Sequence, residues 1–393
     1  MKISKVEIIP FDQQYKGNLI FSAGSTPAVG SFILVRITTD EGFVGLGSTV
    51  GLNKPPMTKN GNSRGSAMAL MKDLAPLLIG EDPLRTDYLF DKLEDAIGDW
   101  YCENWVVLSF FDHALYDLKG RILGIPTYDL LGGLYREKIP LEHIQSFLPT
   151  PEAQAEDALR FIEAGFKSIK LHVDANSEMS IKRMKAARKV LGPDVPIGTD
   201  MSAGYRVSDA LYTIERMNEY DLHFAEQPLH AYDTEGMKIL RSKTNVPMIA
   251  DQAARSITES YERIRVNAFD AAHCLIYRIG GIRRAVKWAN LMDMAYIDYQ
   301  ICTLGNSIAA AAAAHFAVTR PKREKFLDQL GIYLYLHGTT DTASIKDDVI
   351  VAPSGEIKDG YLHAPNGPGL GIEINEEVLS RCIPADISPI VIE

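Results

Sequence analysis

Cysteine is scarce in this sequence, and its spacing excludes the common uses of that residue. A disulfide-stabilised secreted domain or a cysteine-based zinc site would need closely paired cysteines. The chain has no CxxC pair, and its four cysteines are far apart: Cys102, Cys274, Cys302 and Cys382. We therefore expect reduced thiols and a cytoplasmic protein.

The sequence also lacks a cluster of basic residues. Its 41 Lys and Arg residues against 51 Asp and Glu residues give a formal net charge of −10. Binding to a nucleic-acid backbone needs several clustered cations that displace counterions. We therefore expect no nucleic-acid partner, and the acidic excess is typical of an ordinary solvated surface.

Long apolar runs and targeting signals are missing as well. A membrane-spanning helix needs about 20 apolar residues, and the alanine run at 309–314 is far shorter. The opening MKISKVEIIPF alternates like a strand and has no basic region followed by an apolar core, as a signal peptide would. We expect a soluble protein with no membrane partner.

No glycine-rich dinucleotide motif is present either. A nicotinamide oxidoreductase would carry GxGxxG between an early strand and its helix. The segment RIGG at 278–281 follows a late strand and lacks this pattern. The sequence therefore disfavours a hydride-transferring enzyme.

The first 130 residues have the pattern of an α+β domain. Two strands flank the turn Asp40-Glu41-Gly42, which predicts an antiparallel hairpin. A polar, glycine-rich and proline-rich segment at 51–65 predicts a loop, and helical periodicity follows at 67–78 and 105–121. We take 1–130 as one domain.

From about residue 131 the pattern changes to short strands that alternate with helical stretches, which is typical of parallel βα units. Eight such strands in about 200 residues favour a closed, TIM-like (β/α) barrel over an open sheet. The expected strands are 142–147, 168–173, 196–201, 223–228, 247–252, 271–276, 295–302 and 325–330. We place the barrel at 131–360 and expect 361–393, with the glycine-rich segment PNGPGLGIEIN, to return to the N-terminal domain.

Three acidic residues stand near the carboxyl ends of successive expected strands: Asp200, Glu226 and Asp251. Strand ends of a barrel converge on one face, so these carboxylates would repel one another unless a cation lies among them. Oxygen ligands favour Mg²⁺, with Mn²⁺ as an alternative. Single acids at strand ends also cap the following helices, and this competing interpretation stays open.

Lys170 and His172 lie on the strand before these acids. Their spacing of two directs both side chains to one face, about 6.6 Å apart along the strand. Next to a metal and partly buried, either residue could act as a base. A surface salt bridge for Lys170 and a hydrogen-bonded structural role for His172 are the alternatives.

Taken in order, the segments GFKSIKLHV, TDMS, FAEQP and ADQ resemble the barrel motifs of the enolase superfamily, in its muconate lactonizing and mandelate racemase branches. The resemblance extends to SFFDHALYDLKGRILGIPTYDLLGG before the barrel and to YRIGGIRRA and NGPGLGIEIN after it. It implies a modified (β/α) barrel covered by an α+β capping domain, which is formed by the N-terminal region and the C-terminal tail. Loops around 21–31 and 51–65 would close over the substrate.

The same resemblance carries the metal ligands to Asp200, Glu226 and Asp251. Gln252 stands where the family usually has Glu. In the mandelate racemase register Gln252 would be the third ligand, and because it is a poor one, Asp251 is preferred. The family's Lys-x-Lys base motif is here Lys170-Leu171-His172.

Other positions depart further from the family. Counting back from Gly280-Gly281 places Leu275 where relatives carry a proton-transferring residue on strand six. On strand seven the alignment gives Cys302, with Asp298 and Tyr299 nearby, and Asp328 on strand eight matches an acid that binds the substrate carboxylate. A Cys302 thiolate could be a second base, although an isolated buried cysteine is more often inert.

The expected activity is removal of a proton next to a substrate carboxylate, through an enediolate that a divalent metal stabilises. A Lys or His residue that acts as the base is a known pattern of this superfamily. Because Leu275 cannot exchange protons, dehydration of a hydroxy-acid is our first prediction. A racemase, epimerase or cycloisomerase, and a non-catalytic carboxylate-binding protein, are the alternatives. The expected partners are a small carboxylate substrate and further copies of the chain in a homo-oligomer.

Overall fold

The computed structural model places most of the chain. It describes residues 1–15, 20–21, 24–25, 28–52, 62–97, 104–321, 325–330, 345–346, 348–351 and 355–393. Cys102 and parts of the two loops expected to cover the substrate (22–23, 26–27 and 53–61) lie outside these ranges. Within them, no helix is both long and apolar enough to cross a membrane.

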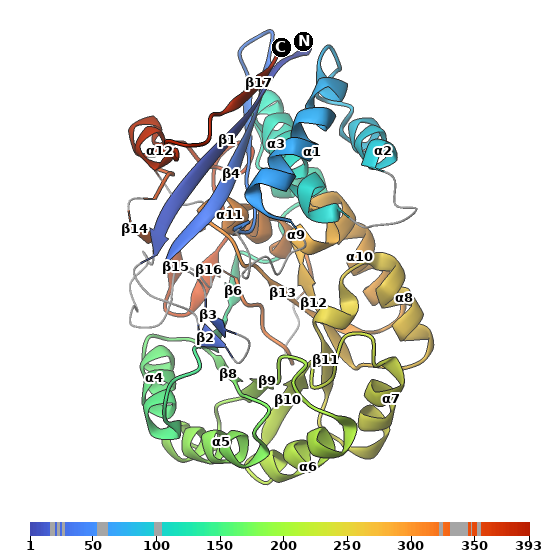
Figure 1. The fold of residues 1–393 in the computed structure, drawn as a ribbon, viewed down its shortest axis with the longest axis vertical. Coiled ribbons are helices and arrows are strands. Elements are labelled where there is room, and N and C mark those ends of the chain that lie inside the picture. Colours follow the sequence, from blue (N-terminus) through green and yellow to red (C-terminus); the bar gives the residue numbers. More distant parts are fainter. Residues whose placement is uncertain are drawn as a thin grey trace.

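The capping domain is built on an antiparallel sheet, the upper part of Figure 1. Strand β1 (Ile3–Tyr15) pairs along its length with β4 (Val29–Thr39), which continues into β5 (Val44–Gly47). The predicted hairpin around Asp40-Glu41-Gly42 is thereby confirmed. The other edge of β1 receives β14 (Ile345–Lys346) and β17 (Ile390–Ile392). The tail therefore returns to the N-terminal region, as predicted, whereas the domain boundaries themselves stay a prediction.

Helices complete this domain. They are α1 (Arg64–Leu74), which continues as the 3₁₀ turn η1 (Ala75–Leu78), α2 (Thr86–Ile97), α3 (Trp105–Leu123), the 3₁₀ turn η2 (Thr127–Leu131) and α12 (Glu376–Cys382). Helix α3 lies so close to β5 that a Cβ atom on Gly47 would fall 2.1 Å from the carbonyl oxygen of Phe110. Only glycine permits this approach.

The barrel is a curled sheet of seven parallel strands in the order β13-β12-β11-β10-β9-β8-β7. The strands are β7 (Glu142–Gln145), β8 (Ser168–His172), β9 (Ile197–Asp200), β10 (Leu222–Glu226), β11 (Met248–Ala250), β12 (Ala271–Leu275) and β13 (Asp298–Cys302). Its surrounding helices are α4 (Pro151–Glu163), α5 (Ser177–Leu191), α6 (Val207–Asn218), α7 (Thr234–Lys243), α8 (Ile257–Arg265), α9 (Ile276–Ile279), α10 (Ile282–Met294) and α11 (Ser307–Ala317). They surround the strands in Figure 1.

The predicted eighth strand is much shorter than expected. Within 325–330 only Asp328 and Gln329 form bridges, to Leu141 beside β7 and to Cys302 of β13. These two residues connect the open edges of the seven-stranded sheet. The prediction of a full strand at 325–330 was therefore wrong in length, while its position in the barrel was right.

Three further strands join the segment before the barrel to the segment after it. Strand β6 (Lys138–Pro140) pairs with β16 (Tyr361–His363), which pairs with β15 (Ile357–Lys358). A separate two-residue pair, β2 (Ile20–Phe21) and β3 (Gly24–Ser25), lies between the capping sheet and the barrel in Figure 1.

Candidate active site

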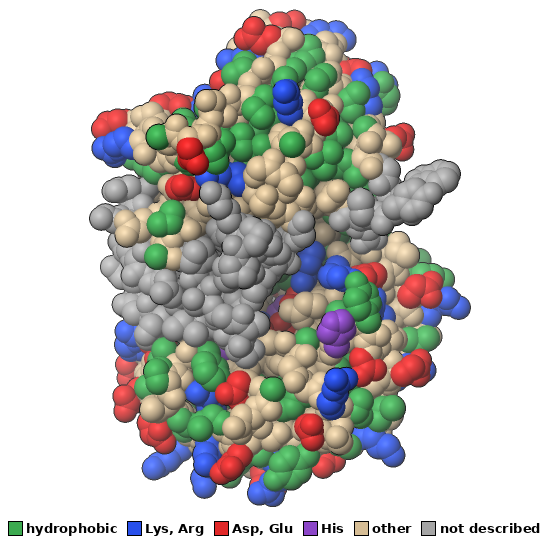
Figure 2. Space-filling model, viewed as in Figure 1, with side chains coloured by type: hydrophobic (Ala, Val, Ile, Leu, Met, Phe, Trp, Pro, Cys, Tyr) green, Lys and Arg blue, Asp and Glu red, His purple; other side chains and the backbone are tan. Residues whose placement is uncertain are grey.

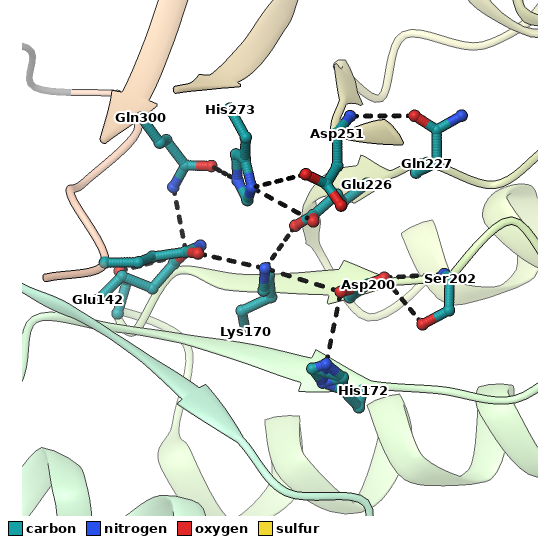
Figure 3. Close-up of polar contacts among 12 residues, drawn as sticks. Glu142, Lys170, His172, Asp200, Ser202, Glu226, Gln227, Asp251, His273 and Gln300 are labelled. Atoms are coloured by element: carbon teal, nitrogen blue, oxygen red, sulfur yellow. Dashed lines mark hydrogen bonds and ion pairs between the residues drawn. The ribbon is translucent and has the colours of Figure 1, made fainter. Parts of the chain in front are cut away.

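The three predicted metal ligands lie together at the carboxyl ends of the barrel strands (Figure 3). Asp200 is the last residue of β9, and Glu226, the last of β10, is its register partner. Asp251 follows β11 directly. Their exposed fractions are only 8%, 1% and 8%, so three acidic groups are withdrawn from water at one place.

Lys170 on β8 points into this group. Its Nζ lies 2.6 Å from Glu226 Oε2 and 3.8 Å from Asp200 Oδ2, and it donates a hydrogen bond to Gln329 Oε1 at 3.2 Å. Burial alone would lower the pKa of Lys170, but the Glu226 and Asp200 carboxylates outweigh it and raise that pKa. Lys170 is therefore an ammonium ion in this arrangement.

His172 lies one position further along the same face of β8, as the spacing predicted. Its Nε2 is 3.4 Å from Asp200 Oδ2. Burial lowers the pKa of His172 to about 4 despite that carboxylate. The ring is consequently neutral near pH 7 and has a nitrogen lone pair that can accept a proton.

A second buried histidine was not among the predicted site residues. His273 on β12 places Nδ1 at 3.3 Å from Glu226 Oε1 and 4.0 Å from Asp251 Oδ1 (Figure 3). Glu226, Asp251 and His273 each offer one ligand atom within 4.8 Å of the others, which makes them a candidate metal-binding group. The sequence could have identified His273 as a site residue, because it precedes Leu275 by two positions and so lies on the same face of the strand.

The carboxylates differ in their electrostatic environment. Burial and the neighbouring charge of Asp200 raise the pKa of Glu226 well above its usual range. Burial acts in the same direction on Asp251, but the guanidinium of Arg278, which donates a hydrogen bond to it, lowers the pKa overall. Burial also raises the pKa of Glu142, which accepts hydrogen bonds from Gln300 and Gln329 deeper in the barrel.

These charges fit a bound divalent cation. Four buried carboxylates (Glu142, Asp200, Glu226 and Asp251) accompany two cations, Lys170 and Arg278, among the described residues of the site. With all four groups ionised, two negative charges have no counter-charge, and buried charges are costly unless compensated. The raised pKa values of Glu226 and Glu142 reflect this cost, which a bound cation would remove. The donor set of hard oxygens suits Mg²⁺ or Mn²⁺.

Cys302 ends β13 and lies near Lys170, whose positive charge acts on it. Burial nevertheless raises the pKa of the Cys302 thiol to about 12. A neutral thiol does not accept protons readily. The geometry thus places Cys302 at the site but gives no support to the predicted thiolate base.

Asp328 is engaged elsewhere. Its carboxylate lies 2.9 Å from Arg136 Nη2 and accepts a hydrogen bond from the backbone nitrogen of Ile301 at 2.9 Å. Neither partner belongs to the carboxylate cluster. The next residue, Gln329, contacts Lys170, because successive residues of an extended segment point to opposite faces. The predicted contact of Asp328 with a substrate is therefore not supported, and Gln329 is the residue that faces the site.

A hollow lies on the face of the molecule shown in Figure 2. Figure 2 shows a hollow between the upper and lower parts of the molecule, beside the residues drawn in grey, with basic, acidic and histidine side chains inside it. The strand ends of the barrel and the capping domain meet at this level in Figure 1. A substrate bound there would contact both parts of the chain.

Comparison with known proteins agrees with this geometry. Two family models match the chain: "Mandelate racemase / muconate lactonizing enzyme, N-terminal domain" over residues 7–132 and "Enolase C-terminal domain-like" over residues 153–378. A curated relative, the N-succinyl-L-Arg/Lys racemase of Bacillus cereus, is 30% identical over 97% of this chain and 98% of its own. Other relatives include epimerases, chloromuconate cycloisomerases and a D-xylonate dehydratase, at 24–28% identity.

A solved structure leads to the same family. The mandelate racemase/muconate lactonizing family protein from Azoarcus sp. EbN1 is 29% identical and superposes with a TM-score of 0.89 over the whole of both chains. The two family models together cover most of this sequence. The chain is therefore an enzyme of the enolase superfamily and belongs to its mandelate racemase/muconate lactonizing enzyme group.

Proposed function

We propose that this enzyme removes the proton next to the carboxylate of a small organic acid and isomerises that acid through an enediolate. The observation that carries the proposal is the buried group of Asp200, Glu226 and Asp251 beside Lys170 and His172. Asp200, Glu226 and Asp251 would hold the divalent cation, Mg²⁺ or Mn²⁺. That ion, when bound, supplies the positive charge that makes an enediolate accessible.

The chain's own residues divide the proton chemistry between them. His172 is the proposed base, because its neutral ring is held beside Asp200 at the rim of the carboxylate group. Lys170 is an ammonium ion and stabilises negative charge on the substrate through its electrostatic field. Burial of both residues strengthens these interactions, since the interior screens charge less than water does.

The relatives favour isomerisation. Most of those named above are racemases, epimerases or cycloisomerases, and the one that covers nearly the whole chain is a racemase of N-succinylated amino acids. An N-acylated amino acid is accordingly the first substrate class to test. Its carboxylate and adjacent C–H group are the features that the proposed site would engage.

Dehydration of a hydroxy-acid is the second candidate. Racemisation with two bases needs a proton-transferring group on the opposite face of the substrate. Among the described residues, β12 and β13 offer Leu275 and the neutral thiol of Cys302 at their ends. A one-base elimination or cycloisomerisation is compatible with that arrangement.

Exchange of the α-proton tests the proposal. Protein loaded with Mg²⁺ or Mn²⁺ is incubated in D₂O with N-succinyl amino acids, dipeptides and hydroxy-acids, and products are followed by mass spectrometry and chiral chromatography. We expect deuterium at the α-position together with a stereoisomer or cyclised product. Loss of water would select the dehydratase instead. Metal binding without exchange or product across the pool would contradict the removal of an α-proton at this site.

A variant assigns the base. His172→Asn should reduce exchange by about 100-fold or more, because it removes a proton acceptor while keeping a polar side chain. The matched control is His223→Asn, which changes a histidine whose Nε2 contacts the carbonyl oxygen of Lys325 instead of the site. Equal activity of the two variants would exclude His172 as the base.

The homo-oligomer expected from the sequence also remains a proposal. Size-exclusion chromatography with light scattering would measure it directly.

A further inference from the structure

The second buried histidine, His273, sits between two parts of the barrel interior. Its Nδ1 faces Glu226 Oε1 and Asp251 Oδ1, and its Nε2 lies 2.8 Å from Gln300 Oε1 (Figure 3). The side chain is only 2% exposed. Which ring nitrogen carries the proton therefore decides what His273 can do.

The hydrogen bonds of Gln300 determine that proton's position. Its amide nitrogen donates to Glu142 Oε2 at 3.1 Å and to the carbonyl oxygen of Leu327 at 2.8 Å. Both partners are acceptors, so the amide nitrogen must face them and the amide oxygen must face His273. An oxygen cannot donate, and Nε2 of His273 consequently carries the hydrogen of that bond.

Nδ1 is then the ring atom that faces the carboxylates, 3.3 Å from Glu226 Oε1 and 4.0 Å from Asp251 Oδ1. In the neutral ring Nδ1 carries a lone pair, and three acceptors directed at one another are unfavourable unless a proton or a metal ion lies between them. A metal ion can bind all three atoms at once, whereas a proton joins only two of them. A histidine that binds a metal through one ring nitrogen characteristically donates the N–H of its other nitrogen to an oxygen acceptor, which fixes the ring. Here Oε1 of Gln300 is that acceptor.

We infer that Nδ1 of His273 is a ligand of the same divalent cation that Glu226 and Asp251 would hold. The inference rests on the metal site of the proposed function and extends it with a nitrogen ligand from β12. Two ligand atoms about 2.1 Å from a shared ion, at a right angle, lie roughly 3 Å apart. The 3.3 Å between Nδ1 and Glu226 Oε1 is close to that separation.

A nitrogen ligand changes the choice of metal. Carboxylate oxygens suit Mg²⁺ and Mn²⁺ alike, whereas imidazole binds transition ions better than it binds Mg²⁺. The wild-type protein should therefore bind Mn²⁺ more tightly than Mg²⁺. In His273→Asn the ratio of the two affinities should fall by about tenfold.

Electron paramagnetic resonance of the Mn²⁺-loaded full-length protein tests the inference without measuring activity. An electron spin-echo experiment detects a nitrogen nucleus that is bonded to the ion. We expect a nitrogen-14 coupling in the wild-type protein, and protein labelled with nitrogen-15 histidine should show the nitrogen-15 pattern instead. Unchanged nitrogen-14 signals after labelling, or no nitrogen signal with Mn²⁺ bound, would overturn the inference.

Two variants then identify the histidine. His273→Asn should lose the coupling, and His172→Asn, which alters the other histidine beside the carboxylates, should keep it. The opposite result would assign the ligand to His172 and refute the inference. Gln300→Met, which removes the acceptor for Nε2–H, should weaken Mn²⁺ binding by about tenfold.

The outcomes separate this inference from the proposed function. Failure of Mn²⁺ and Mg²⁺ to bind at all in calorimetry would reject the metal site itself. Mn²⁺ binding without a nitrogen coupling would reject only the role of His273. Thermal unfolding of each variant shows whether a lost signal reflects an unfolded protein.

Discussion

The ammonium nitrogen of Lys170 lies 2.6 Å from Oε2 of Glu226, inside the barrel, where neither group contacts bulk water to a significant extent. Lys170 therefore provides one of the positive charges that make this arrangement of buried acids tolerable. It also competes with any metal ion for the same carboxylate. Its removal should consequently affect metal binding and catalysis in opposite directions.

Lys170→Met is expected to bind Mn²⁺ more tightly, by up to about tenfold, because a like charge beside the ion is lost. The same variant should exchange the substrate α-proton at least about 100-fold more slowly, since the ammonium ion no longer stabilises the developing charge. Calorimetry measures the first quantity and deuterium incorporation the second. Weaker Mn²⁺ binding by a folded Lys170→Met protein would contradict the proposed competition.

A substitution at Gly47 should destabilise the contact between β5 and α3. A Cβ atom there would lie 2.1 Å from the carbonyl oxygen of Phe110 and 2.6 Å from the backbone nitrogen of Ala114. Gly47→Ala should lower the free energy of unfolding by about 3 kcal/mol, because backbone atoms must move apart. Gly65→Ala is the matched control, since the nearest atom to its Cβ is 4.0 Å away and alanine favours the helix. Equal unfolding curves for the two variants would disprove the close approach.

Asp117 of α3 connects distant segments through its buried carboxylate. It accepts hydrogen bonds from the backbone nitrogens of Leu46 at 2.8 Å and Leu370 at 2.7 Å. Asp117→Ala would leave both donors unpaired and should cost about 3 kcal/mol of unfolding free energy. Asp129→Ala, at an exposed position of η2, serves as the control and should stay within about 0.5 kcal/mol of the wild type. A small effect at Asp117 would mean that water reaches these donors.

His315 should make stability depend on pH. Burial lowers its pKa to about 4, and its Nδ1 accepts a hydrogen bond from the backbone nitrogen of Tyr128, which requires the neutral ring. In the unfolded chain the pKa is about 6.5. Between these values the unfolded chain binds the extra proton, so this contribution to stability is present above pH 6.5 and is lost as the pH falls toward 4.

Urea unfolding at pH 7 and pH 5 measures the effect of His315. The wild type should lose about 2 kcal/mol more than His315→Asn does over this interval, because asparagine does not titrate. Other buried histidines, such as His113, contribute to the slope in both proteins and cancel in the comparison. Parallel slopes for the two proteins would show that His315 does not carry the effect.

The repeating part of this structure could be predicted from the sequence. Asp200, Glu226 and Asp251 recur once per βα unit, and strand ends of a barrel meet on one face, so their proximity followed from spacing alone. Lys170 and His172 followed equally from the two-residue period of a strand. These inferences need only local geometry and the repeat.

The remaining features depend on register between distant segments. The hydrogen bond from Gln300 to Glu142 joins residues 158 positions apart, and no local pattern specifies it. Counting back from Gly280-Gly281 identified Leu275 as the strand-six position and missed His273, although both side chains lie on the same face of that strand. Asp328 binds Arg136, whereas the next residue, Gln329, contacts Lys170. Only these two residues form bridges, and so short a strand has no alternating pattern in the sequence that would show which of them faces the site.

The strand β1 has a consequence for how the chain is synthesised. One of its edges is covered by β4, which follows closely in sequence, but the other is covered by β14 and β17, more than 300 residues later. Until residues 390–392 have left the ribosome, that edge has unpaired backbone groups and can recruit other strands. The growing polypeptide therefore carries an aggregation-prone edge throughout elongation of the barrel, and chaperone engagement during translation should concentrate there.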